Sequence, residues 1–255
     1  MSQDGIHGAG EEGGAIVSGN NDTDLHIGRT YNIFVLEFTS DSPYTFGFRP
    51  CPMKKFTSLS LSRYLKELCS KKPIPGGGSA SAYVAALGMG LAEMVAGIGI
   101  AKLDSGSQAS LRKAMRVLAK ARKDALQAVD LDPQVYQAVL KSYKKAKGIQ
   151  NEEKKNRLID EALENSFRLQ ADLALLIIVA KESARSFEGI RGSIKNDLKV
   201  SAALLNAAFQ GAYDTARINV VYLKDAQKKS RAEQALEELK RRFESINAFE
   251  NVSKS

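Results

Sequence analysis

Residues 73–102 read PIPGGGSASAYVAALGMGLAEMVAGIGIAK, a glycine turn that leads directly into a long helix of small apolar residues. Gly76, Gly77 and Gly78 remove the side chains from a loop that ends at a helix N-terminus, where backbone N–H groups can reach a ligand. Ser79 follows and is the expected N-cap. The turn lacks the Lys-Ser/Thr ending of a nucleotide P-loop, which argues against triphosphate binding. A plain tight turn is an equally good interpretation.

The helix after the turn is nearly uncharged from Ala80 to Ala101 and is long enough to span a bilayer. Glu93 lies at its middle, and most of its residues are Ala or Gly, so we expect the central buried helix of a soluble bundle. Helical patterns continue to about Ala248, and no β-hairpin or βαβ signal follows residue 53. The sequence therefore predicts an all-α fold, an antiparallel bundle of about six helices.

One predicted helix boundary depends on a proline. Pro133 suits the first turn of a helix, with Asp132 as its N-cap, and the preceding helix is then expected to end near Asp130.

The charge divides the chain into two parts. Residues 1–52 hold seven Asp/Glu and two Arg (net −5), whereas residues 53–255 hold 35 Lys/Arg and 22 Asp/Glu (net +13). We interpret 1–52 as a largely disordered extension, either a partner-binding arm or a segment upstream of a true start at Met53. The basic helical domain, 53–255, favours an anionic partner, although a solvated Lys-rich surface explains its charge equally well. Trp is absent, so a stacking platform for nucleic acid is poorly supported.

The cysteines and histidines limit the chemistry. Cys51 and Cys69 make neither a disulfide framework nor a metal site. His7 and His26 both lie in the extension, which excludes a Ser-His-Asp triad and His-ligated zinc from the basic domain. Acid–base chemistry there must use Asp, Glu, Lys, Tyr, Cys or water. The first 20 residues are polar and acidic, without a secretory signal, so we expect a cytoplasmic protein.

Polar residues interrupt the apolar helices at four places. Each has a structural explanation as a helix cap, a cation at a helix C-terminus or a solvated surface residue. The four places are Lys102 after the apolar helix, Asp130, Asp132 and Tyr136 around Pro133, Asn196 and Asp197 after a glycine-rich break, and Arg217 and Asn219 farther along the same helix.

The order of these segments is more specific than any one of them. The glycine turn and its helix, then DLDPQVY at 130–136, then NDLKVSAALLNAAFQGAYDTARINVVYLKD at 196–225, resemble the cyclodeaminase/cyclohydrolase family of folate enzymes. That family includes the cyclodeaminase domain of formiminotransferase-cyclodeaminase and stand-alone methenyltetrahydrofolate cyclohydrolases. The resemblance covers about residues 53–247, with 140–190 similar only as helix.

The resemblance implies a homodimer with a folate pocket near the glycine turn, no metal and no tightly bound cofactor. The substrate is then a tetrahydrofolate derivative, with or without a polyglutamate tail, and neither a membrane nor nucleic acid is an expected partner. It implies Asp197 and Asp132 as catalytic residues, and as substrate-binding residues Pro75, Gly76, Gly77, Gly78, Ser79, Lys102, Tyr136, Asn196, Arg217 and Asn219.

The expected reaction is cyclisation of 5-formiminotetrahydrofolate to 5,10-methenyltetrahydrofolate with release of ammonia. Asp197 is the first candidate for the general acid/base and Asp132 the second, because partial burial can raise a carboxyl pKa. The glycine backbone, Lys102 and Arg217 would hold the anionic tail. The alternatives are methenyltetrahydrofolate cyclohydrolase and a non-catalytic basic helical module. Departures from the family pattern at 97–99, 102–105, 166–168 and 191–194 leave altered substrate choice or lost activity open.

Overall fold

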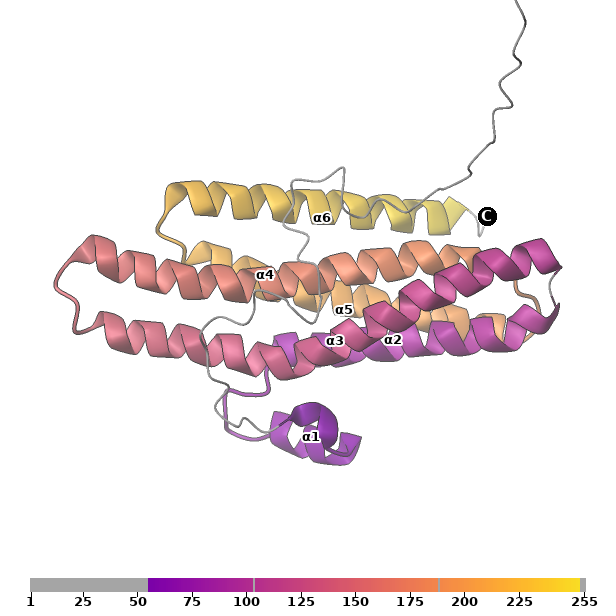
Figure 1. Cartoon of the computed structure of the whole chain (residues 1–255), viewed down its shortest axis with the longest axis horizontal. Coiled ribbons are helices and arrows are strands. Elements are labelled where there is room, and N and C mark those ends of the chain that lie inside the picture. Colours follow the sequence, from indigo (N-terminus) through magenta and orange to yellow (C-terminus); the bar gives the residue numbers. More distant parts are fainter. Residues whose placement is uncertain (1–54, 103, 188, 253–255) are drawn as a thin grey trace, which may run out of the picture. The chain divides into compact units, whose positions relative to one another are not determined.

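The computed structural model describes residues 55–102, 104–187 and 189–252 (Figure 1). Helices form every regular element within these ranges, so the predicted all-α bundle of about six helices is confirmed. The elements are η1 (Phe56–Ser58), α1 (Leu61–Leu68), α2 (Gly77–Gly99), η2 (Ile100–Lys102), α3 (Ser105–Ala146), α4 (Glu152–Ala184), η3 (Arg185–Phe187), α5 (Lys195–Val221) and α6 (Ala226–Val252). The predictions for the extension, including a start at Met53, lie outside the described residues.

Four long helices, α2 to α5, form the bundle, and α6 packs along α4 and α5 (Figure 1). α2 packs against both α3 and α5, and α4 packs against the same two helices. The contacts of the α2 glycines show that α2 and α5 are antiparallel, because Gly77 lies by Thr215 whereas Gly88 lies by Leu205. A Cβ atom at Gly88 would lie 3.0 Å from the Leu205 side chain, so this glycine permits the close approach of the two helices.

The expectation of a central buried helix is met by only one face of α2, the face that packs against α3 and α5. Among the described residues, α2 is the one helix long and apolar enough to cross a membrane, and half of its most apolar window is buried in the protein. A core helix of a soluble protein passes the same test. The opposite face carries an uncharged stripe in which Leu87 and Ile98 are each 52% exposed and Met94 is 42% exposed. Its many Ala and Gly residues are typical of a core helix, but only one of its faces packs against other described residues.

The predicted helix start at Pro133 is wrong, because α3 runs without a break from Ser105 to Ala146. Proline has no N–H, so Pro133 cannot donate the usual helical hydrogen bond to the carbonyl of Val129, four residues earlier. The hydroxyl of Ser79, from α2, donates to that carbonyl at 3.0 Å. The neighbouring helix thus supplies the missing donor, and Asp132 lies inside α3 instead of capping a new helix.

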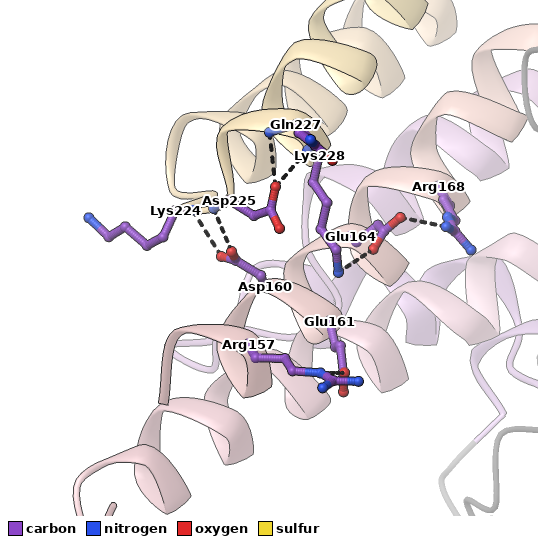
Figure 2. A network of polar contacts seen from close by, with 9 residues as sticks. All are labelled: Arg157, Asp160, Glu161, Glu164, Arg168, Lys224, Asp225, Gln227 and Lys228. Carbon is purple, nitrogen blue, oxygen red and sulfur yellow. Dashed lines mark hydrogen bonds and ion pairs between the residues drawn. The ribbon is translucent and has the colours of Figure 1, made fainter. Parts of the chain in front are cut away.

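Polar contacts fix the beginning of α6 to α4 (Figure 2). Asp160 of α4, which is 2% exposed, accepts hydrogen bonds from the backbone N–H groups of Lys224 and Asp225 in the turn before α6. Asp225 in turn accepts from two N–H groups in the first turn of α6. Lys228 extends from α6 to Glu164 of α4, at 2.9 Å. These contacts hold the end of α5 in position, next to the region described below.

Candidate functional site

The glycine turn begins α2 differently from the sequence expectation. Gly76, not Ser79, is the N-cap residue, and no side chain caps the helix there. Ser79 lies within the first turn and is completely buried. Its hydroxyl is used twice: it donates to Val129 and lies 3.2 Å from the hydroxyl of Tyr64 in α1. Ser79 therefore joins α1, α2 and α3.

A buried carboxylate lies at the N-terminus of α2. Asp132 of α3 is only 8% exposed, and its Oδ1 accepts a hydrogen bond from Nε2 of Gln170 in α4 at 2.8 Å. The backbone N–H of Ser79 also donates to the carboxyl group. Burial raises the pKa of Asp132 from 3.8 to about 6, and the hydrogen bonds from Ser79 and Gln170 partly oppose this shift. A carboxyl group with this pKa exchanges protons close to neutral pH.

Of the glycines in the turn, Gly78 is the one that this arrangement requires. A Cβ atom on Gly78 would clash with both Asp132 Oδ1 and Gln170 Nε2, so these two buried side chains would have to move. A Cβ atom on Gly77 would meet only Thr215 Oγ1, at 3.8 Å, which is an ordinary contact. The glycine at 78 thus lets the backbone approach a carboxyl group that the protein itself provides.

Gln170 was not identified from the sequence. Its side chain is completely buried, and its Oε1 has no hydrogen-bond partner among the described residues. The signal that could have revealed it is a lone amide in the apolar stretch LQADLALL, residues 169–176, in the region that resembled the family only as helix.

Both α3 and α5 continue beyond the point where α2 begins. The N-terminus of α2 lies beside Asp132 and Thr215, so the residues that follow these two extend past it. Exposed aromatic and aliphatic side chains lie on both extensions. They are Tyr136, Leu140 and Tyr143 on α3, Ile218 and Val221 on α5, and Tyr222 directly after α5. Burial raises the pKa of Tyr143, and Tyr222 lies near it.

Two further predicted residues lie on the extension of α5. Asn219 is 9% exposed, and its Nδ2 donates to the backbone carbonyl of Thr215, which is the residue beside Gly77. Arg217 is exposed and makes a loose ion pair of 4.0 Å with Asp214. Asn219 thus lies one helical turn beyond Thr215, the residue beside Gly77, and Arg217 is exposed on the same helical segment.

Another group of predicted residues lies far from the turn. Asn196 and Asp197 are in the first turn of α5, and Lys102 follows the C-terminus of α2. Because α2 and α5 are antiparallel, this end of α5 lies beside the C-terminal half of α2. The 23 residues of α2 measure about 33 Å at 1.5 Å per residue. One chain therefore brings together Pro75–Ser79, Asp132, Tyr136 and Asn219, but not Asp132 and Asp197.

A metal site is not apparent in the described part of the chain, where no three His, Cys, Asp or Glu side chains form a cluster that could hold an ion. The arrangement at the glycine turn is instead suited to proton transfer by a buried carboxyl group.

Comparisons with known proteins agree with this fold. The sequence model described as Formiminotransferase-cyclodeaminase matches residues 60–238. The crystal structure of formiminotetrahydrofolate cyclodeaminase from Thermotoga maritima at 2.80 Å resolution is similar, with a TM-score of 0.57 and 23% sequence identity over 74% of this chain and 92% of that chain. At this identity the similarity establishes the fold. No curated protein sequence matches.

The family match confirms the resemblance seen in the sequence and covers well over half of the residues. This chain therefore belongs to the formiminotransferase-cyclodeaminase family.

Proposed function

We propose that this protein is a folate one-carbon enzyme, a formiminotetrahydrofolate cyclodeaminase that forms 5,10-methenyltetrahydrofolate and ammonia. Membership of the family supports a folate substrate. The observation that carries the proposal is the buried Asp132 at the glycine turn, with its pKa raised to about 6. A general acid or base works best when its pKa is near the working pH, and Asp132 meets this condition.

The reaction requires one proton to leave and another to arrive. The formimino group reacts in its protonated, amidinium form. Nitrogen-10 of the substrate attacks the formimino carbon and loses its proton, and the formimino nitrogen becomes a neutral NH₂ group. That amine must be protonated before the carbon–nitrogen bond breaks and ammonia leaves. Asp132 accepts a proton in the first stage and returns one in the second, so the carboxyl group ends in its starting state.

Substrate contacts follow from the same placement. The exposed ring of Tyr136 lies one helical turn beyond Asp132 and is positioned to pack against the pteridine or the aminobenzoyl ring. Arg217, exposed on the continuation of α5, is the nearby cation for the glutamate tail, with Asn219 and the backbone of Pro75 to Gly77 beside it. The N–H of Ser79 already binds Asp132, so it is not a donor for the tail.

We further propose that two copies of the chain form a homodimer through the exposed stripe of α2. The stripe consists of the exposed residues Leu87, Met94 and Ile98 and the partly buried residues Ala80, Val84 and Leu91. Its spacing of 4, 3, 4, 3 and 4 residues reads the same in both directions, about a centre at residue 89. An antiparallel copy would therefore place Leu87 opposite Leu91, and Ala80 opposite Ile98, along about 27 Å of helix.

Such a dimer would also join the two separated groups of site residues. It would bring the C-terminal end of α2 in the second copy, with Lys102, Asn196 and Asp197, towards the glycine turn of the first. Lys102 could then bind the anionic tail, and Asp197 could assist Asp132. We propose no tightly bound cofactor and a cytoplasmic location, without membrane or nucleic acid as partner.

The alternative in the same site is hydrolysis of methenyltetrahydrofolate to 10-formyltetrahydrofolate, in which Asp132 would activate water. The test is turnover of each folate by the purified protein, followed by methenyl absorbance and ammonia release. Asp132→Asn should lower kcat by about 100-fold or more, the usual contribution of a general acid or base. Near-normal turnover by this variant would remove Asp132 from the mechanism.

A non-catalytic basic module would behave differently from either enzyme. It would turn over neither folate, and it would bind nucleic acid with an affinity that falls steeply as salt rises.

A further inference from the structure

The amide of Gln170 is placed in an unusual way. The side chain is completely buried, its Nε2 donates to Asp132 Oδ1, and its Oε1 has no partner among the described residues. A buried carbonyl oxygen without a donor is destabilising, and such groups are rare in folded proteins. The unpaired oxygen belongs to the same amide that binds the candidate catalytic group.

The Gln170 amide can serve either protonation state of the Asp132 carboxyl group, with a different atom for each. An ionised carboxylate only accepts hydrogen bonds, whereas a protonated carboxyl group also donates one. An amide carries a donor and an acceptor that exchange places when the group rotates by about 180°. Nε2 therefore suits the ionised form of Asp132, and Oε1, after rotation, suits the protonated form.

We propose that Gln170 is a positioning residue that pairs with Asp132 in both of its protonation states. In the ionised state Nε2–H donates to Oδ1. When Asp132 takes up a proton, the amide turns and Oε1 accepts from the new O–H. The carboxyl group can thus gain and lose a proton without leaving itself unpaired or changing its position. This inference rests on the proposed function only for its link to turnover.

The groups around Asp132 come from α1, α2, α3 and α4. Tyr64, from α1, is buried against Ser79, and its pKa is raised chiefly by that burial, so it stays neutral. The contacts from α2 and α4 are the Ser79 backbone N–H and the Gln170 amide, which carry no charge. Asp130, two residues earlier on α3, is bound by the backbone N–H groups of Phe56 and Thr57 and by the Thr57 hydroxyl.

The test begins with the unaltered full chain and does not require activity. NMR titration should show the Asp132 carboxyl carbon changing with a midpoint near pH 6. The side-chain NH₂ signals of Gln170 should change with the same midpoint, because the amide exchanges its partner atom. Gln170 signals that do not respond while Asp132 titrates would overturn the proposal.

Variants then separate positioning from packing. Gln170→Met keeps the length of the side chain and removes the partner of both protonation states. Because the lost hydrogen bond to the ionised carboxylate is charge-assisted and stronger than the one to the neutral form, the Asp132 midpoint should rise by roughly half to one pH unit. The matched control is Gln134→Met, a Gln on α3 whose Nε2 donates to the Asp130 carbonyl, and it should leave the midpoint unchanged. An equal shift in both variants, or none in Gln170→Met, would contradict the proposal.

Turnover gives the second measurement. In Gln170→Met the ionisation seen in the pH profile of kcat should move by the same amount as the NMR midpoint, with little change in KM. A kcat profile that stays in place while the NMR midpoint moves would show that Gln170 does not act in turnover. If the unaltered chain turns over neither folate, the proposed function fails, whereas linked titration of Gln170 and Asp132 would still stand.

Discussion

Replacing Asp132 with Asn should make the protein more stable at neutral and alkaline pH. The carboxyl group is 8% exposed, and its pKa is about 6 in the folded protein against an ordinary value of 3.8. The difference, about 2, corresponds to about 3 kcal/mol. The folded state holds the proton more tightly than the unfolded state, so ionisation of Asp132 lowers the free energy of unfolding. This loss of stability is absent below pH 3.8, grows as the pH rises between the two pKa values, and is complete above about pH 6.

The Asn side chain fits the site without a charge. Its oxygen can accept from the Ser79 N–H, and its NH₂ group can donate to Gln170 Oε1, which otherwise has no partner among the described residues. We therefore expect the free energy of unfolding of Asp132→Asn, relative to that of the unaltered protein, to be about 2 to 3 kcal/mol higher at pH 8 than at pH 4.

Urea unfolding at pH 4 and pH 8, followed by circular dichroism, measures this difference. Asp197→Asn is the matched control, since Asp197 is partly exposed in the first turn of α5 and should change stability by less than about 1 kcal/mol at either pH. If Asp132→Asn is destabilising to the same extent at both values, the burial of an ionised Asp132 is not costly and the reasoning is refuted.

Three further predictions concern the same helices. Ser79→Ala should lower the free energy of unfolding by about 1 to 3 kcal/mol. The loss should be smaller in a protein that already carries Pro133→Ala, because the backbone N–H of Ala at 133 can donate to the Val129 carbonyl within α3. Strictly additive effects of the two substitutions in urea unfolding would exclude this coupling. Gly78→Ala should strongly destabilise the protein and abolish turnover, whereas Gly77→Ala should be tolerated, and equal melting temperatures of the two variants would contradict the described contacts. Leu87→Glu should convert the proposed dimer to monomer in analytical ultracentrifugation, and an unchanged sedimentation coefficient would rule out α2 as the interface.

The sequence predicted the helices better than their boundaries. Apolar periodicity and the absence of strand signals were sufficient for an all-α bundle, because both are local properties. Pro133 was misread because its missing hydrogen bond is compensated by Ser79, which is 54 residues away in the chain. The same distant contact explains why Ser79 does not act as the predicted N-cap.

The candidate site was predicted only in part. Order along the chain identified the glycine turn and Asp132, but it did not reveal that α2 separates Asp132 from Asp197. Gln170 could not be found by pattern, because a single amide in an apolar helix gains meaning only from the carboxyl group it contacts. The exposed stripe of α2 was likewise hidden, since its residues are as apolar as those on the buried face.

The most direct test of the account is the methenyl absorbance of the purified full chain incubated with 5-formiminotetrahydrofolate. We expect the absorbance to rise as ammonia is released in equal amount, and the rate to fall by about 100-fold or more in Asp132→Asn, although that variant remains folded. Absence of any absorbance change with the folded, unaltered protein, for this folate and for methenyltetrahydrofolate alike, would contradict the proposed enzyme activity.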